Sequence, residues 1–161
     1  METIAYSKMV SPSSILDTDH DRIAALCDEL LEAYGTDDWA VVRSAWGRFE
    51  RALTAHIQAE ETWLLPFYAI AEPAEAQALR RDHDVLRRRL DEIGFGIDLH
   101  CANDEVGREM VALLRDHARR EDSTLYPWAD QHLDPLVAAA LRARLEQRTL
   151  EALSSAARAR A

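Results

Sequence analysis

Hydrophobic residues recur every three or four positions along most of this chain, the spacing that places them on one face of an α-helix. No segment alternates hydrophobic and polar residues as a half-buried β-strand does. The periodic segments predict helices over about 15–34, 38–70, 73–93, 103–128 and 135–157. Their connections are short, so neighbouring helices should run antiparallel. The sequence therefore predicts an all-α fold: an antiparallel up-down four-helix bundle over about 14–132, with an additional C-terminal helix over about 135–157.

Glycine and proline residues suggest where these helices end or bend. Gly35 should close the first helix, and Gly94 with Gly96 should end the third. Pro66 has no N–H group, so the second helix should kink or loosen near it. Short polar side chains should cap the helix starts, at Ser14, Asp37 or Asp38, Asn103 and Asp134.

The C-terminal helix has a hydrophobic face of its own, formed by Leu136, Val137, Leu141 and Leu145. Such a face needs a surface to cover. Two surfaces are open to it, the flank of the bundle and a second copy of the chain. A homodimer through this helix is therefore one expectation.

Composition and charge narrow the class of protein. With 161 residues, 48% of them hydrophobic and 30% charged, the chain should form a single domain over 1–161. The net charge of −10 argues against a nucleic-acid partner, because phosphates would be repelled. The longest hydrophobic run, 63–71, is too short to span a membrane. With two cysteines and no secretory signal, we expect a cytoplasmic protein.

The chain contains an internal repeat built around histidine and glutamate. The segment 56–66 reads HIQAEETWLLP, and 117–127 reads HARREDSTLYP. Each half of the chain also places a lone histidine between two aspartates on the preceding helix, with similar separations of 36 positions (His20 to His56) and 34 positions (His83 to His117). Residues four apart share one face of a helix, so each repeat offers an imidazole and a carboxylate in the same direction. The repeat predicts pseudo-twofold symmetry.

Six residues of these repeats should meet in one layer of the bundle. Their distances from the connecting turns agree to within about one helical turn, and their helical neighbours are hydrophobic. Two buried carboxylates would be costly without partners, and a pair of metal ions bridged by both removes that cost. Imidazole with bridging carboxylate favours two irons, and we expect an oxo or hydroxo bridge between them and an open position on each. The candidate metal ligands are His20, His56, Glu60, His83, His117 and Glu121.

These six residues resemble the hemerythrin-like (HHE cation-binding) family, over roughly 15–131. The resemblance implies a helical bundle that holds two irons. Oxygen-carrying members add a fifth histidine one turn after the third-helix ligand, where this chain has Arg87. They also use an aspartate five residues after the last histidine, where this chain has Glu121 at four. The chain therefore resembles more closely the branch implicated in iron–sulfur centre repair and in nitric oxide or peroxide handling, without the cysteine-bearing N-terminal domain of the repair proteins.

Other polar and aromatic residues near the motifs are expected to have structural roles. His100 and His132 fall outside the layer and should face solvent, and Cys27 should fill the core. Acidic residues beside the ligand histidines should be surface charges, as should the run 87–89. These acidic residues are Asp19, Asp21, Asp82, Asp84 and Asp116, and Glu61 and Asp122 lie similarly off the ligand stripe. Core packing is expected for Phe49, Trp63, Tyr126 and Trp128.

Two functions follow from this pattern. The first is a non-haem di-iron protein that binds or reacts with dioxygen, nitric oxide or hydrogen peroxide in redox-stress or iron handling. The alternative is an iron, oxygen or nitric oxide sensor, or binding module, that acts through a protein partner. The pattern is compatible with both binding and turnover. A ferritin-like oxidase is disfavoured because the chain has no Glu-x-x-His pair, and a zinc hydrolase because it has no His-Glu-x-x-His.

Overall fold

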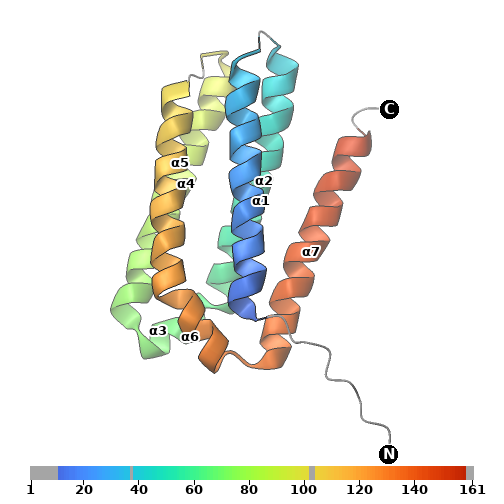
Figure 1. The fold of residues 1–161 in the computed structure, drawn as a ribbon. Coiled ribbons are helices and arrows are strands. Elements are labelled where there is room, and N and C mark those ends of the chain that lie inside the picture. The colour runs from blue at the N-terminus through green and yellow to red at the C-terminus, as the bar shows by residue number, and fades with distance from the viewer. Residues whose placement is uncertain (1–10, 37, 102–103, 159–161) are drawn as a thin grey trace, which may run out of the picture.

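The computed structural model of the chain describes residues 11–36, 38–101 and 104–158, with the side chains of 104 and 148–158 left aside. Every regular element in these ranges is a helix, which confirms the predicted fold class. Four long helices stand side by side in Figure 1, and each packs against two neighbours: α1 against α2 and α5, and α4 against α2 and α5. The helices are α1 (Pro12–Tyr34), α2 (Trp39–Trp63), α3 (Leu65–Ala71), α4 (Pro73–Asp98), α5 (Asp104–Ser123), α6 (Leu125–His132) and α7 (Pro135–Arg158).

The first helix begins earlier than its sequence suggests. Ser11, not Ser14, is the N-cap, and its side chain accepts a hydrogen bond from the backbone N–H of Ser14 at 3.2 Å. Pro12 then occupies the first turn, where a missing N–H costs nothing. The expected end at Gly35 is confirmed.

Two of the other expected caps lie in described parts of the chain. Asp38 accepts hydrogen bonds from the backbone N–H groups of the first turn of α2, and Asp134 accepts one from Leu136 at 2.7 Å. The expected cap at Asn103 and the alternative at Asp37 lie outside the described residues.

Proline breaks two of the helices that the hydrophobic pattern joins. The expected helix 38–70 is divided at Leu64 into α2 and α3, with Pro66 in the first turn of α3. The expected helix 103–128 is likewise divided at Thr124 into α5 and α6, with Pro127 near the start of α6. Proline has no N–H group for the preceding turn, so each helix stops and a new one begins. The second break, which was not expected, repeats the first.

The third long helix continues where it was expected to end. α4 runs through Gly94 and Gly96 to Asp98, so the predicted stop near Ile93 is wrong. Gly94 packs against Trp46, and a Cβ atom at position 94 would lie 3.3 Å from the Trp46 ring. Ile97 is buried one turn later. Close packing against α2 thus outweighs the low helix propensity of glycine.

The C-terminal helix covers the flank of its own bundle. α7 packs against α1 and α2, where Leu141 and Leu145 are buried. Leu136, at the start of the same helix, is 81% exposed. The sequence left two surfaces possible for the hydrophobic face of this helix, the bundle flank and a second copy of the chain. In the structure this face packs on the bundle flank.

Two hydrophobic clusters fill the bundle, one above and one below a polar layer. On α1, Leu16 belongs to the lower cluster and Ile23 to the upper, with His20 between them. On α4, Leu79 and Leu86 flank His83 in the same way. The layer of candidate ligands is therefore enclosed by core on both sides.

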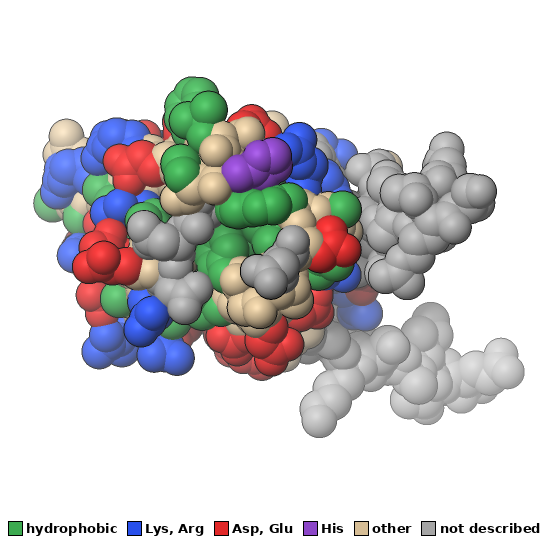
Figure 2. All heavy atoms as spheres, turned by 90° about the horizontal axis from the view of Figure 1, so that it is seen from above, with side chains coloured by type: hydrophobic (Ala, Val, Ile, Leu, Met, Phe, Trp, Pro, Cys, Tyr) green, Lys and Arg blue, Asp and Glu red, His purple; other side chains and the backbone are tan. Residues whose placement is uncertain are grey.

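The surface is mixed in character. Seen from above in Figure 2, hydrophobic side chains gather over the loop end of the bundle and charged side chains surround them. Phe95 and Leu99, at the end of α4, are among the exposed hydrophobic residues. None of the helices in the described ranges combines the length and hydropathy needed to cross a bilayer.

Candidate metal centre

The four long helices bring all six candidate ligands to one point of the bundle. α1 contributes one histidine, α4 contributes one, and α2 and α5 each contribute a histidine with the glutamate one turn later. Five of the six are buried, with Glu60 and Glu121 fully enclosed, and the His20 side chain is 17% exposed. The role of these residues as ligands stays a prediction.

The six side chains form two groups that share both glutamates. In each group the potential ligand atoms lie within 4.8 Å of one another, a spacing that could hold a metal ion. The first group, called the α1/α2 group here, has His20 and His56 as its histidines. The second, the α4/α5 group, has His83 and His117. Glu60 and Glu121 belong to both.

The distances show how each glutamate faces both groups with different oxygen atoms. In the α1/α2 group, Nε2 of His20 lies 3.2 Å from Oε2 of Glu121, and Nε2 of His56 lies 3.4 Å from Oε1 of Glu60. In the α4/α5 group, Nε2 of His117 lies 3.1 Å from Oε1 of Glu121, and Nε2 of His83 lies 3.3 Å from Oε2 of Glu60. Each carboxylate thus offers one oxygen to each group, as a bridging ligand does.

Unpaired buried atoms test whether the residues fit a metal pair. Among the described residues, the buried side-chain atoms without a hydrogen-bond partner include Oε2 of Glu60, Nε2 of His83, both ring nitrogens of His117 and Oε1 of Glu121. Leaving one such atom unpaired costs about 1–3 kcal/mol. A divalent cation between them would satisfy the two oxygens and both Nε2 atoms. The donor set therefore fits two metal ions.

Electrostatics in the layer favours positive charge. Burial disfavours the charged form of His56, but Glu60, Asp19 and Glu121 outweigh it and raise its pKa to about 9. Burial likewise opposes charge on His83, and Glu121 with Glu60 raises its pKa to about 10. Burial would raise the pKa of Glu121, but the surrounding histidines hold it well below its usual range. Metal ions would take the place of these protons.

The Asp19 carboxylate fixes the orientation of the His56 ring by a hydrogen bond. Nδ1 of His56 donates a hydrogen bond to Oδ2 of Asp19 at 2.9 Å, and Asp19 also accepts from Arg22 at 2.7 and 3.0 Å. Asp19 is 6% exposed, so its expected place on the surface is wrong. It points away from the face of α1 that carries His20, but α2 lies on that side. The hydrogen bond fixes the ring so that Nε2 faces the centre.

A second carboxylate does the same for His83. Nδ1 of His83 donates to Oε1 of Glu61 at 3.0 Å, and Arg87 grips both oxygens of Glu61 at 2.9 and 2.6 Å. Neither Glu61 nor Arg87 is the solvated surface charge that the sequence suggested. Asp21, Asp84 and Asp116 are exposed as expected, and the half-buried Asp82 pairs with Arg120 at 3.0 Å.

Tyr126 reaches into the layer from α6. Its hydroxyl lies 2.9 Å from Oε1 of Glu60, 3.2 Å from Oε2 of Glu121 and 3.0 Å from Nε2 of His20. From its sequence position, Tyr126 was expected to be a packing residue of the core. It is buried, but its polar end belongs to the centre. The repeat held a signal for this role, because Tyr126 stands where the first repeat has Leu65.

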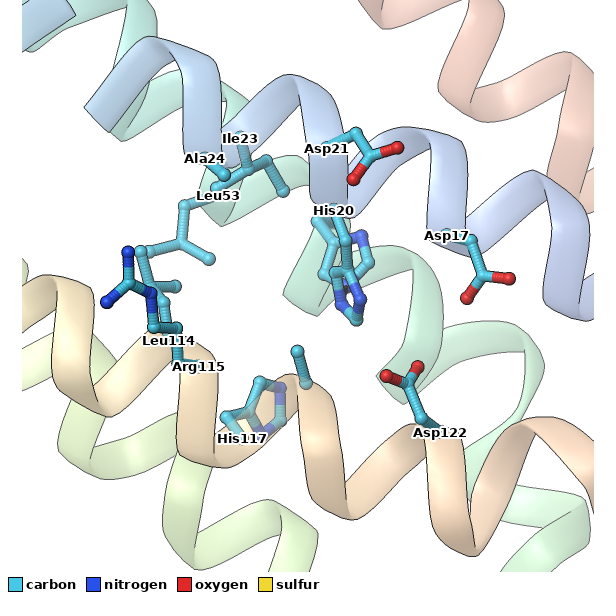
Figure 3. A pocket seen from close by; sticks show the side chains of 12 residues that line it. Asp17, His20, Asp21, Ile23, Ala24, Leu53, Leu114, Arg115, His117 and Asp122 are labelled. Atoms are coloured by element: carbon cyan, nitrogen blue, oxygen red, sulfur yellow. Dashed lines mark hydrogen bonds between the residues drawn. The ribbon is translucent and has the colours of Figure 1, made fainter. Parts of the chain in front are cut away.

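A pocket of about 330 Å³ opens from the surface to the centre between α1 and α5. Its inner wall includes His20, His56 and His117. In Figure 3, His20 extends from α1 toward α5, which carries His117, and Asp17 and Asp122 lie to one side. Hydrophobic wall is provided by Ile23, Ala24, Leu53, Leu114 and Ala118, and the charged lining also includes Asp21 and Arg115.

The remaining residues singled out from the sequence lie away from the centre. His100 is exposed against Trp39, with ring centroids 4.7 Å apart, and His132 is exposed against Trp128, with centroids 5.3 Å apart. Cys27 is buried in the upper cluster, as expected of a core residue.

Comparison with known proteins identifies the family. The pattern of the hemerythrin HHE cation binding domain matches residues 11–129. A DNA nickase from Nostoc sp. (strain PCC 7120 / SAG 25.82 / UTEX 2576) is 28% identical over 117 residues, which are 70% of this chain but only 31% of the nickase. No solved structure matches the chain. With most of its length matched, the chain belongs to the hemerythrin HHE cation-binding domain family.

Proposed function

We propose that this chain is a non-haem di-iron protein that binds or reacts with a small diatomic molecule or peroxide, in redox-stress or iron handling. The observation that carries the proposal is the pair of buried His/Glu groups that share Glu60 and Glu121 at the end of a pocket. Imidazole and bridging carboxylate in a helical bundle suit iron. When bound, the irons would supply open coordination positions and redox chemistry.

The pocket supports a small, uncharged ligand. Its volume of about 330 Å³ is at the low end for ligand sites, and much of its wall is hydrophobic. Three carboxylates line it, those of Asp17, Asp21 and Asp122, against the single guanidinium of Arg115. This balance disfavours anions. Dioxygen, nitric oxide and hydrogen peroxide are small enough and neutral.

Arg87 argues against reversible oxygen carriage of the hemerythrin type. It stands where the family's oxygen carriers have a fifth histidine, and its guanidinium is engaged with Glu61. A coordination position that the fifth histidine fills in those carriers would be left to solvent or ligand here. More open positions support reaction with the bound molecule over its simple release.

Metal analysis of the purified chain tests the proposal. We expect about two irons per chain after iron-replete expression, with a near-ultraviolet absorption band of an oxo-bridged pair. His56→Ala should abolish this band, because it removes a histidine of the α1/α2 group and the partner of Asp19. His100→Ala, which changes an exposed histidine outside the layer, is the matched control and should keep both irons. A wild-type chain without iron would refute the proposal.

The second candidate is a sensor or binding module that signals to a protein partner. α7 favours it, because this helix packs against α1 and α2, which carry His20, His56 and Glu60. Iron loading should then change hydrogen exchange in α7 or the oligomeric state. An unchanged exchange profile with and without iron would count against a sensor.

The similarity to a DNA nickase does not imply that this chain cuts DNA. The matched part is 31% of that protein, so the shared segment is one portion of a longer chain. The net charge of −10 still predicts weak affinity for nucleic acid. A gel-shift titration with DNA at low salt tests this prediction.

A further inference from the structure

The two groups of the centre differ in the hydrogen bonds that their ligand atoms already make. In the α4/α5 group, the four inward atoms contact only one another, at 3.1–3.3 Å, and none has a hydrogen bond from outside the group. These atoms are Oε2 of Glu60, Nε2 of His83, Nε2 of His117 and Oε1 of Glu121. In the α1/α2 group, every corresponding atom has a hydrogen-bond partner. Nε2 of His20 and Nε2 of His56 lie 3.0 Å apart, and both glutamate oxygens lie within reach of the Tyr126 hydroxyl, which has one proton that either can accept.

Tyr126 causes this difference. Its hydroxyl is within 3.2 Å of three of the four inward atoms of the α1/α2 group. The internal repeat offers no equivalent on the other side: Tyr126 follows His117 by nine positions, and the residue nine positions after His56 is Leu65. Leu65 is fully buried but has no polar atom in its side chain to offer. The pseudo-twofold symmetry of the ligands is therefore broken by one hydroxyl group.

We propose that the two metal positions fill in a fixed order, the α4/α5 position first, and that the Tyr126 hydroxyl sets this order by weakening the α1/α2 position. The inference rests on the proposed di-metal function and adds to it an assignment of the tightly held and the exchangeable ion. Tyr126 acts here as a positioning residue for the α1/α2 group.

The order follows from what each ion must displace. A divalent cation in either group must displace contacts between histidine and glutamate of similar length, 3.1–3.4 Å. In the α4/α5 group no further hydrogen-bond partner competes for the four buried atoms. A cation in the α1/α2 group competes with the Tyr126 hydroxyl for Oε1 of Glu60, Oε2 of Glu121 and Nε2 of His20. Hydrogen bonds to charged groups are strong enough that losing one weakens binding by about tenfold or more.

The order matters for the chemistry of the pocket. His20 and His56, the histidines of the α1/α2 group, both line the pocket wall. The more weakly held ion is thus the one with both of its histidines at the opening. At limiting iron the chain would hold one ion, and the second would bind and leave through the pocket as supply changes.

Stepwise metal titration of the full chain tests the inference. The protein is stripped with a chelator and titrated with Co(II), whose visible bands report each ion as it is bound. We expect two steps in the wild-type chain whose dissociation constants differ about tenfold or more. Tyr126→Phe removes only the hydroxyl and should tighten the second step about tenfold. Tyr68→Phe, a buried tyrosine of α3 outside both groups, is the control and should leave both steps unchanged.

Histidine variants assign each step to a group. His83→Gln should abolish the tight step, and His56→Gln should abolish the weak step and keep the tight one. Two equal steps in the wild type, the reverse assignment, or a second step unaltered by Tyr126→Phe would each overturn the proposed order while leaving the di-metal centre in place. Fewer than two ions bound by the wild type would instead refute the proposed function. Circular dichroism checks folding, and if a histidine variant does not fold, Tyr126→Phe decides alone.

Discussion

Two of the four histidines in the centre donate a hydrogen bond to a carboxylate through Nδ1, the ring nitrogen that faces away from the centre. His56 donates to Asp19 and His83 donates to Glu61, whereas Nδ1 of the buried His117 has no partner. The anchored histidines lie on α2 and α4, and the other two lie on α1 and α5. His20, His56 and His117 line the pocket, so His83 is the anchored histidine that lies away from the opening.

Removing the Asp19 anchor should weaken metal binding without changing the ligands. Asp19→Asn replaces the acceptor at His56 with a side chain that cannot fix the ring as firmly, and we expect a loss of metal affinity of about 10–100-fold. Asp28→Asn, an exposed aspartate further along α1, should leave the affinity unchanged. Competition with a chromophoric chelator measures both. Equal affinities for the two variants would argue that Asp19 has no orienting role.

The two cysteines should differ sharply in reactivity. Burial, with a smaller contribution from Asp28, raises the pKa of the Cys27 thiol to about 12, so almost no thiolate forms at pH 8. Cys101 is exposed. A chromogenic disulfide reagent at pH 8 should therefore titrate one thiol per native chain rapidly, and the second only after denaturation. Cys101→Ser should remove the rapid phase, and two rapid thiols in the native wild type would contradict the buried position of Cys27.

Among the helices, local sequence determines some of the ends, and tertiary contacts determine the others. Pro66 and Pro127 end α2 and α5 through local chemistry. The break near Pro66 was expected, whereas the one near Pro127 was not, although the proline has the same offset in the repeat. Gly94 does not end α4, because its missing Cβ allows the helix to approach Trp46 closely. For α7, periodicity identified the buried face but could not select the surface that it covers.

Substitutions on the two faces of α7 should separate buried from exposed leucines. Leu141 is fully buried against the bundle, so Leu141→Ala should lower the free energy of unfolding by about 2–5 kcal/mol. Leu136, 81% exposed on the same helix, is the control, and Leu136→Ala should change it by no more than about 0.5 kcal/mol. Urea denaturation measures both. A small effect at Leu141 would contradict the packing of α7 on the bundle.

A homodimer through the C-terminal helix stays a prediction. It would have to use the outward side of α7, because the inward side is taken by the bundle. The solution mass from light scattering tests it, and a monomer at all concentrations would exclude it.

In the whole molecule, the bundle isolates a polar layer between two hydrophobic clusters, and a pocket between α1 and α5 reaches this layer. The clusters exclude water from above and below, which strengthens the electrostatic interactions within the layer. The pocket between α1 and α5 reaches three of the histidines. Small molecules are expected to arrive by this path.

Narrowing the pocket should slow the reaction and spare the metal. Ala118 lines the pocket on α5, so Ala118→Phe should reduce the rate at which the iron(II)-loaded protein reacts with nitric oxide or dioxygen several-fold, with unchanged iron content. Ala112→Phe places the same side chain on an exposed position of the same helix and should not slow the reaction. Stopped-flow absorption measures the rates. Equal rates for wild type and Ala118→Phe would show that ligands arrive by another path.

The helical class, the bundle and the convergence of the six residues could all be predicted from the sequence. Period and repeat suffice for these, because a residue on the hydrophobic stripe of a helix must face the core wherever the neighbouring helices lie. The distances from the connecting turns, which agree to within about one helical turn, then bring the six side chains to one level.

The surroundings of that layer could not be predicted in this way, because they depend on how the helices pack. Asp19 and Glu61 lie off the stripe, and Tyr126 comes from a helix that begins after a break, so their partners depend on how neighbouring helices are rotated and spaced. The same is true of the pocket and of the covering of α7. Sequence periodicity fixes the inward direction of one helix, whereas contacts beside that direction exist only once the helices are packed together.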